Sequence, residues 1–306
     1  RLVHEFYAHG LDAHTPHILM SVSKSLLGLL AGILVEDGTL DPAAPVTGYI
    51  PEVADTAYAG ATVRHLLDMR AGVAFEENYL ATSGAIIAYR KAQNWNPPEP
   101  GDPPSDLRSF YAGMTGTDGP HGDRFHYVSP NTDLLGWVIE RATTRRYADL
   151  MSERLWRPMG AERSAYITVD RLGAPRCAGG FCATVRDLAR VGQLLVQGGV
   201  RDGRRVIPSA WIDDLASGGD AAAWARGDFV ELFRAAPMRY RSQWYALDGP
   251  APLLFGFGVH GQNLFVDRAR EIVVAKVSSQ ALPIDEARNA LTMRAVQAIV
   301  AALARG

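Results

Sequence analysis

Residues 17–25 read His17-Ile18-Leu19-Met20-Ser21-Val22-Ser23-Lys24-Ser25, and apolar residues then recur at helical spacing as far as Val35. This periodicity predicts a buried helix that starts near Ser21 and ends before Gly38, since glycine is favoured just after helix C-termini. Ser21 and Lys24 are nearly one helical turn apart, so the lysine amine can fold back towards the serine hydroxyl. The pair is therefore either a nucleophile with its base, or a helix-capping serine followed by an exposed lysine.

The sequence around Lys24 offers a physical route to catalysis. The expected helix is otherwise mostly apolar, and desolvation lowers the pKa of an amine, which would leave Lys24 neutral in the resting protein and able to act as a base. The start of a helix also presents free backbone N–H groups that can bind a developing oxyanion.

A second segment, Tyr127-Val128-Ser129, precedes Pro130. Serine followed by proline is the favoured order for an N-cap and a first helical residue, so a helix is expected from Ser129 with Tyr127 just outside it. If a neighbouring cation lowers the pKa of Tyr127, its phenol can relay a proton to a leaving group. The alternative is a packed aromatic ring whose hydroxyl is already hydrogen-bonded.

A third segment, His260-Gly261-Gln262-Asn263, lies between two strand-like runs. Glycine there permits close approach of a ligand, and a following N–H group could point at an oxyanion. Taken alone, this tetrapeptide does not identify a function.

The remaining patterns predict a fold of helices and antiparallel strands. Strands are expected at 2–7, 241–246, 255–260, 263–267 and 271–278, and further helices at 62–69, 184–197 and 285–304. Thr62 and Thr184 are expected to cap two of these helices, and Leu291, Val296, Ile299 and Leu303 are expected on the buried face of the last. The expected class is α/β of the α+β type, an antiparallel sheet flanked by helices.

Strands and helices are segregated along the chain, which suggests how it is divided. We expect a sheet-and-helix domain from residues 1–38 and 171–306, with residues 39–170 as an inserted helical subdomain. The segment near 72–104 is long and rich in proline, and irregular segments of that length are often lids or binding loops.

Composition excludes several classes of protein. The 306 residues are 47% hydrophobic and 21% charged, with a formal net charge of -2. Such a chain is not disordered, and it lacks the basic excess of a general nucleic-acid binder or a polybasic membrane-surface protein. No apolar run is long enough to span a bilayer. We therefore expect a cytoplasmic protein with a small-molecule substrate as its partner, and leave a homodimer open.

No metal or cofactor is expected. His14 and His17 are three residues apart and His121 and His126 five apart, and neither pair has the spacing of a zinc-binding helix. The two cysteines, Cys177 and Cys182, have no partners at zinc-finger spacing and are expected to be small buried hydrophobic residues.

Taken in this order, the three segments resemble the serine beta-lactamase and penicillin-binding-protein superfamily, in particular its class C-like branch of esterases and amide hydrolases, which includes the nylon-oligomer hydrolases. In that family a Ser-x-x-Lys motif, a Tyr-x-Asn or Tyr-x-Ser motif, and a Lys-Thr-Gly or His-x-Gly type of motif converge on one cleft. The resemblance implies a beta-lactamase-like fold in which Ser21 is the nucleophile, Lys24 its base and Tyr127 the group that carries the proton to the leaving group.

The same resemblance implies the substrate-binding residues. Ser129, His260 and Gly261 would line the cleft, and the backbone N–H groups of Ser21 and Asn263 would form the oxyanion hole. Tyr79 and Trp95, in the lid, would be aromatic residues that contact substrate.

The implied activity is that of a serine hydrolase that cleaves an amide or an ester through an acyl-enzyme, with linear aminohexanoate-type amides or short-chain esters as substrates. Because His260 stands where the family's third motif often has lysine, the usual anchor for a beta-lactam carboxylate is absent. A beta-lactamase or DD-peptidase acting on cell-wall-like substrates is one alternative. The other is a binding or sensor protein that is acylated without turnover.

Overall fold

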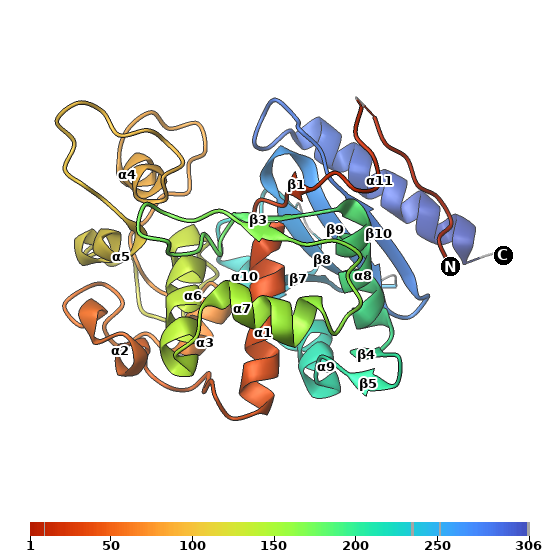
Figure 1. The fold of residues 1–306 in the computed structure, drawn as a ribbon, viewed down its shortest axis with the longest axis horizontal. Coiled ribbons are helices and arrows are strands. Elements are labelled where there is room, and N and C mark those ends of the chain that lie inside the picture. Colours follow the sequence, from red (N-terminus) through yellow and green to blue (C-terminus); the bar gives the residue numbers. More distant parts are fainter. Residues whose placement is uncertain (9, 234–235, 251, 305–306) are drawn as a thin grey trace.

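A five-stranded antiparallel sheet forms the centre of the molecule. The computed structural model describes residues 1–306 except 9, 234–235, 251 and 305–306. The strand order is β10-β9-β8-β7-β6 (Figure 1). The strands are β6 Met238–Arg241, β7 Trp244–Leu247, β8 Leu253–Gly258, β9 Gln262–Asp267 and β10 Ile272–Lys276.

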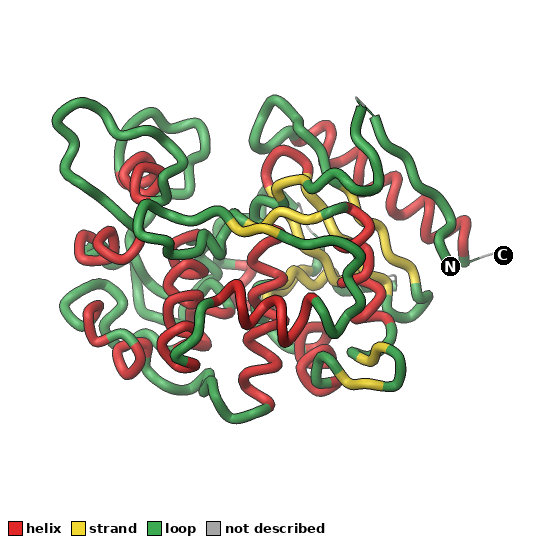
Figure 2. Tube along the Cα trace, in the orientation of Figure 1, coloured by secondary structure: helices red, strands yellow, loops and turns green. Residues whose placement is uncertain are grey.

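The two faces of the sheet belong to two different hydrophobic clusters. Leu254, Leu264 and Val266 pack in the larger core, whereas Phe255 and Phe265 pack in a second, aromatic-rich cluster. This follows from the alternation of side chains along a strand, because neighbouring residues point to opposite faces. Both faces are therefore covered, the first by α1 and α8 and the second by α11 (Figures 1 and 2).

Helices account for most of the remaining regular structure. They are α1 Val22–Glu36, α2 Val46–Tyr49, α3 Val63–Leu67, α4 Ala85–Ala92, α5 Leu107–Phe110, α6 Ser129–Thr143, α7 Tyr147–Leu150, α8 Val185–Val196, α9 Ser209–Ser217, α10 Ala221–Ala225 and α11 Glu286–Leu303. Short 3-10 turns occupy Pro51–Val53, Tyr111–Gly113 and Val259–Gly261, and a π-helical turn occupies Met151–Trp156. The central helix, α1, is buried from Val22 to Leu34, so the segment that starts with Ser21 is anchored along its whole length.

Two small sheets complete the fold. In one, β1 His17–Ile18 and β2 Tyr166–Ile167 flank β3 Phe181–Ala183, all antiparallel. The other is a hairpin of β4 Val200–Arg201 and β5 Arg204–Arg205. The pairing of β1 with β3 fixes the chain immediately before Ser21.

Several expectations from the sequence are confirmed. The helix near Ser21, the helix of residues 184–197 and the helix of residues 285–304 correspond to α1, α8 and α11. Thr62 and Thr184 each accept a hydrogen bond from a backbone N–H of the first turn of α3 and α8. The antiparallel sheet flanked by helices is as expected, and the division at residues 38 and 171 stays a prediction.

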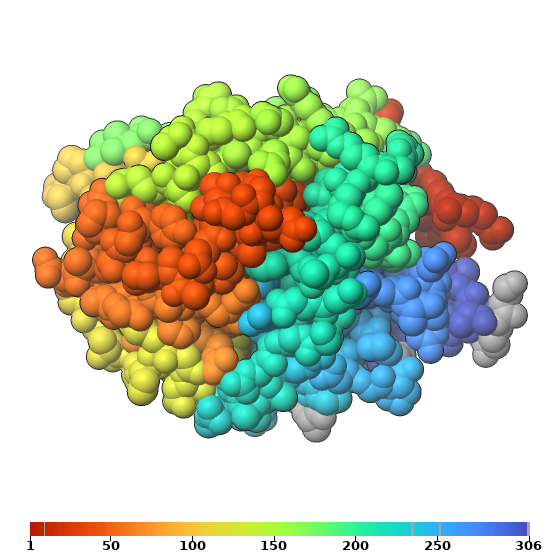
Figure 3. Space-filling view, turned by 90° about the horizontal axis from the view of Figure 1, so that it is seen from below, coloured from red at the N-terminus to blue at the C-terminus, as the bar shows by residue number. Residues whose placement is uncertain are grey.

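The expected strand at residues 2–7 is wrong. This segment is irregular, and Leu2, Val3 and Phe6 are exposed. In the described part of the chain no strand pairs with it. Alternation of apolar and polar residues does not make a strand unless a neighbouring strand accepts and donates its backbone hydrogen bonds. The N-terminal residues instead project at one side of the molecule (Figure 3).

Two details in the C-terminal third also differ from expectation. The single strand expected at 241–246 is two strands joined by a tight turn, in which Ser242 and Gln243 take positive φ values of 49° and 70°. On α11, Val296 and Val300 are the buried residues, whereas Leu291 is 58% exposed, and Ile299 and Leu303 are exposed too. Apolar residues occur around much of this helix, so its pattern did not single out one face.

Candidate active site

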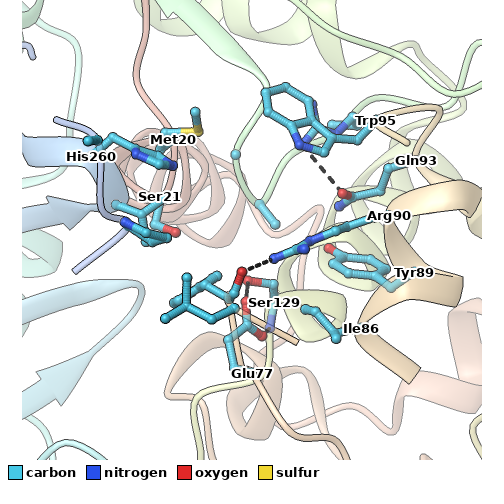
Figure 4. Close-up of a pocket in the computed structure, with 18 residues that line it drawn as sticks. Met20, Ser21, Glu77, Ile86, Tyr89, Arg90, Gln93, Trp95, Ser129 and His260 are labelled. Carbon is cyan, nitrogen blue, oxygen red and sulfur yellow. Dashed lines mark hydrogen bonds between the residues drawn. The ribbon is translucent and has the colours of Figure 1, made fainter. Parts of the chain in front are cut away.

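Ser21 lies at the start of α1 with its hydroxyl available for chemistry. It occupies the N-cap position but makes no capping hydrogen bond with its side chain. The preceding residue, Met20, has a φ of 46°, in the left-handed region that side-chain-bearing residues rarely adopt. This sharp turn presents Ser21 at the wall of a cavity of about 360 Å³ (Figure 4).

Lys24 is buried beside Ser21, which excludes the alternative of an exposed lysine. Its side chain is 1% exposed. The amine Nζ lies 3.0 Å from Ser21 Oγ, 3.0 Å from Ser129 Oγ and 2.7 Å from the carbonyl oxygen of Ala178. Burial lowers the pKa of Lys24 to about 8, although the nearby carboxylates of Glu77 and Asp133 favour the charged form. The direction of this shift is the expected one, and it makes the neutral amine accessible near pH 8, whereas a neutral Lys24 in the resting protein stays a prediction.

The contacts of Ser129 determine where the lone pair of Lys24 points. Ser129 Oγ donates to Glu77 Oε1 at 2.6 Å, so Ser129 must accept a hydrogen bond from Lys24. The Ala178 carbonyl accepts a second one. A neutral amine has only two N–H donors, and both are used by these acceptors. The lone pair of neutral Lys24 is thus left facing the Ser21 hydroxyl.

Ser129 does not cap the helix that it begins. It is the first helical residue of α6, with Val128 at the N-cap position, and its backbone N–H donates to Glu77 Oε2 at 2.8 Å. Glu77 therefore takes both polar groups of Ser129, which leaves the hydroxyl no capping role. Burial raises the pKa of Glu77, while the nearby Lys24 amine lowers it.

Tyr127 is buried next to the same pair. The Ser21 hydroxyl lies close enough to its phenol to oppose the rise of its pKa, and Lys24 Nζ lies 5.1 Å from its ring centroid. Burial raises the pKa of Tyr127, and the Glu77 carboxylate raises it further. The condition stated from the sequence, that a neighbouring cation lowers this pKa, is not met, because the net shift is upward. The phenol therefore keeps its proton at neutral pH and can donate it to a leaving group.

Asp133 holds in place a peptide group that contacts Lys24. This buried carboxylate accepts hydrogen bonds from the backbone N–H of Ala178 at 2.7 Å, from Gln93 Nε2 at 3.1 Å and from the hydroxyl of Tyr89. It thereby fixes the peptide whose carbonyl binds Lys24. Neither Glu77 nor Asp133 was predicted as a site residue from the sequence. Glu77 lies in an irregular segment, and Asp133, although it follows the tyrosine motif closely, contacts groups that are far along the chain.

Of the third motif, His260-Gly261-Gln262-Asn263, only His260 lines the cavity. His260 lines it, with a φ of 60° and Nδ1 2.7 Å from the carbonyl oxygen of Gln280. Gly261 does not line the cavity, and its role is steric, because a Cβ there would lie 2.6 Å from Gln280 Nε2. Asn263 is paired in β9 with Phe257 on one side and Lys276 on the other. Its backbone N–H belongs to an inner strand and is not free to bind an oxyanion.

The end of β8 lies against the start of α1. A Cβ built on Gly258 would lie 3.1 Å from the backbone N of Ser21 and 2.8 Å from the carbonyl oxygen of Leu19. Glycine at this position allows the strand to approach the start of α1. The next residue, Val259, lines the cavity.

The two aromatic residues expected in the lid, Tyr79 and Trp95, both line the cavity, and Figure 4 shows Trp95 there. The nearby Glu77 carboxylate adds to the effect of burial in raising the pKa of the Tyr79 phenol. Trp95 is 47% exposed and stacks on the guanidinium of Arg176, which lies 4.4 Å from the ring centroid. The segment that carries them also contains α4, which supplies another wall of the cavity.

The histidines and cysteines are engaged elsewhere. His17 and His121 contact the carbonyl oxygens of Ile18 and Ala59, and His126 contacts Asp228. Both cysteines are free thiols. Among the described residues no group of three or more His, Cys, Asp or Glu side chains could hold a metal ion, and no helix is both long and apolar enough to cross a membrane.

Comparison with known proteins identifies the family. A family model described as beta-lactamase matches residues 3–298, nearly the whole chain. This chain belongs to the beta-lactamase family. The resemblance seen in the three sequence motifs is confirmed, and so is the beta-lactamase-like fold.

Individual relatives agree with this assignment. The chain is 38% identical over 275 residues to the 6-aminohexanoate-dimer hydrolase of Paenarthrobacter ureafaciens, which covers 90% of this chain and 69% of the relative. This similarity agrees with the resemblance of the three motifs to the branch that includes the nylon-oligomer hydrolases. A solved Bacillus anthracis protein, provisionally assigned as a 6-aminohexanoate-dimer hydrolase, superposes with a TM-score of 0.86 at 26% identity, covering 100% of this chain and 77% of that one. A Streptomyces D-stereospecific amidohydrolase shares the fold, with a TM-score of 0.62 at 18% identity and coverage of 87% and 82%.

Proposed function

We propose that this protein is a serine hydrolase that cleaves an amide or ester bond through an acyl-enzyme. The observation that carries the proposal is the environment of Lys24 Nζ, which lies 3.0 Å from Ser21 Oγ while two fixed acceptors take its other hydrogens. Such an amine is a base aimed at one hydroxyl. The family relationship and the identity to 6-aminohexanoate-dimer hydrolase support linear amides, alongside short esters, as substrates.

In the first step Ser21 Oγ attacks the carbonyl carbon as its proton passes to neutral Lys24. The oxyanion is bound by the backbone N–H of Ser21, and we assign the second donor to the end of β8 at residues 258–259 in place of Asn263. The C–N or C–O bond then breaks, and the leaving group takes a proton from Tyr127. Lys24 returns the proton to Tyr127, and water releases the acid from Ser21 by the same route.

The test of this function is a screen of three substrate types on one preparation, with Ser21→Ala as the blank. p-Nitrophenyl esters and the linear 6-aminohexanoate dimer report the proposed activity, and nitrocefin reports a beta-lactamase. A fluorophosphonate probe is expected to label Ser21 and no other serine. Labelling that persists in Ser21→Ala would disprove the assignment of the nucleophile. A stable acyl adduct without product release would instead indicate an acylable sensor.

The role of Tyr127 is tested by the difference between leaving groups. An amine must be protonated as the C–N bond breaks, whereas p-nitrophenolate leaves without a proton. Tyr127→Phe should therefore lower amide turnover by about 10²- to 10⁴-fold and ester turnover far less. An equal loss on both substrates would mean that Tyr127 positions or activates Ser21 rather than protonating the leaving group.

A further inference from the structure

Two arginine side chains, Arg90 and Arg176, line the cavity. Arg176 is only 6% exposed, and its guanidinium donates to two neutral acceptors, Thr168 Oγ1 at 3.1 Å and Gln93 Oε1 at 3.3 Å. Its Nε is buried without any hydrogen-bond partner. Arg90 extends from α4 into the cavity and donates to the carbonyl oxygen of Tyr79 at 2.8 Å (Figure 4). Among the described residues, neither arginine forms an ion pair.

Other cations of the same region are paired, which makes these two exceptional. Lys91, next to Arg90, lies 2.6 Å from Asp102. Arg108 and Arg171 pair with Glu140 and Asp106. The lysine and the arginines just outside the cavity are thus ion-paired. Of the two arginines that face the cavity, Arg176 has the buried Asp133 carboxylate within electrostatic range, with Gln93 hydrogen-bonded to both, whereas Arg90 donates only to a carbonyl oxygen.

The carboxylate on the cavity wall, Glu77, is already engaged. Ser129 donates to both of its oxygens, through the backbone N–H and through the hydroxyl. Its charge also faces the Lys24 amine. Glu77 therefore serves the catalytic group and does not neutralise the two arginines.

We propose that the substrate supplies the missing negative charge: it is an amide or ester that carries a carboxylate on the part occupying this cavity, bound by Arg90 with Arg176 behind it. This proposal rests on the proposed function and narrows its substrate class. A guanidinium matches a carboxylate geometrically, since its parallel N–H groups can donate to both oxygens. Trp95, stacked on Arg176, would cover the chain of methylene groups between the carboxylate and the scissile bond.

The experiment compares matched amides that differ only in charge. On the acyl side we choose adipoyl mono-p-nitroanilide, its neutral carboxamide and the cationic 6-aminohexanoyl p-nitroanilide. On the leaving-group side we choose N-hexanoyl-6-aminohexanoate and its neutral carboxamide. In either the acyl-side or the leaving-group-side series, the carboxylate substrate is expected to have a kcat/KM about 10- to 100-fold higher than that of its neutral partner. This factor corresponds to the free energy of a hydrogen bond to a charged group. Equal values on both sides would overturn the proposal.

Variants assign the effect to the arginine. Arg90→Gln should remove most of the preference, mainly through KM, and Arg90→Asp should reverse it in favour of a cationic substrate. Arg108→Gln, which removes an arginine from the neighbouring α5 outside the cavity, is the matched control and should keep the preference. If Arg90→Gln lowers the neutral and the carboxylate substrates by the same factor, Arg90 has only a structural role and the proposal is wrong.

A binding measurement separates this proposal from the proposed function. The Ser21→Ala protein should bind the carboxylate amide about 10- to 100-fold more tightly than its neutral partner by calorimetry, whether or not turnover occurs. Turnover of the neutral substrates that depends on Ser21, with no carboxylate preference in binding, would leave the hydrolase function standing and reject the substrate class. Preferential binding of the carboxylate amide, without turnover of any substrate, would support the substrate class and reject the hydrolase function.

Discussion

At the scale of single residues, the proposed chemistry depends on the charge of Lys24. Burial makes the neutral form accessible near physiological pH by lowering the pKa to about 8. The hydrogen bonds to Ser129 and Ala178 then orient it. Burial has the opposite effect on Tyr127, whose phenol it holds in the protonated form. One desolvated environment thus produces both a base and an acid, because it disfavours the charged state of each group.

This charge predicts the pH dependence of acylation. Below a pH of about 8 only the deprotonated fraction of Lys24 can accept the Ser21 proton, so kcat/KM for a neutral ester should fall about tenfold for each pH unit. Above it the rate should level off. The measurement is a pH profile of kcat/KM, with Lys24→Arg as a variant expected to be nearly inactive since guanidinium is not deprotonated in proteins. A rate that falls as the pH rises through 8 would contradict the base role.

Glu77 predicts a shift of that profile. Its carboxylate stabilises the Lys24 ammonium, so removing the negative charge lowers the pKa of Lys24 further. In Glu77→Gln the rising limb should therefore move to lower pH, even where the plateau falls because Ser129 is held less firmly. The adjacent Glu76, which is exposed, provides the control: Glu76→Gln should leave the limb in place. A limb that moves to higher pH would show that Glu77 does not act on Lys24 electrostatically.

At the scale of elements, the site exists because the start of α1 meets the end of β8. Gly258 has an extended backbone, with φ of -132°, so glycine is needed there for space and not for conformation. The antiparallel pairing of β8 with β9 holds this strand end in register from Leu254 to Gly258. The distance between the nucleophile and the strand is therefore determined by backbone packing.

This contact predicts the effect of a single methyl group. Gly258→Ala places a Cβ 2.8 Å from the Leu19 carbonyl oxygen and 3.1 Å from the Ser21 nitrogen, so the start of α1 must shift. Misplacement of reacting groups on this scale lowers kcat by about 10²-fold. Gly113→Ala is the control, because a Cβ there meets nothing within 4 Å. Both variants should remain folded by circular dichroism. Unchanged kcat in Gly258→Ala would mean that the contact does not position Ser21.

Elements with strong local signals were predictable from the sequence. The periodicity of α1 and α8 and the caps at Thr62 and Thr184 are local, and all four are found. The turn at Ser242 and Gln243 was not predictable, since two positive φ values occur there without a glycine or asparagine to signal them. Alternation at residues 2–7 predicted a strand, but a strand also requires a neighbouring edge, which is a property of the tertiary structure.

At the scale of the whole molecule, the site is assembled from segments far apart in the chain. Lys24, Glu77, Ser129 and Ala178 come from four separate regions, yet they form one continuous set of hydrogen bonds. Short motifs gave the positions of Ser21, Lys24 and Tyr127. Glu77 and Arg176 lie in irregular segments, where no periodicity reveals which side chains turn inward, so only the folded chain shows their contacts.

The distribution of tryptophans over the molecule predicts an optical report of the cavity. Five of the six tryptophans are buried, whereas Trp95 is 47% exposed and lines the cavity. Iodide should therefore quench one fraction of the fluorescence, aided by the positive charge of Arg176 beneath the Trp95 ring. That fraction should disappear in Trp95→Phe and persist in the control Trp137→Phe. In the Ser21→Ala protein, saturation with an uncleaved amide substrate should protect Trp95. Quenching that survives in Trp95→Phe would show that another tryptophan reaches solvent, and a lack of protection would place the bound substrate away from this wall of the cavity.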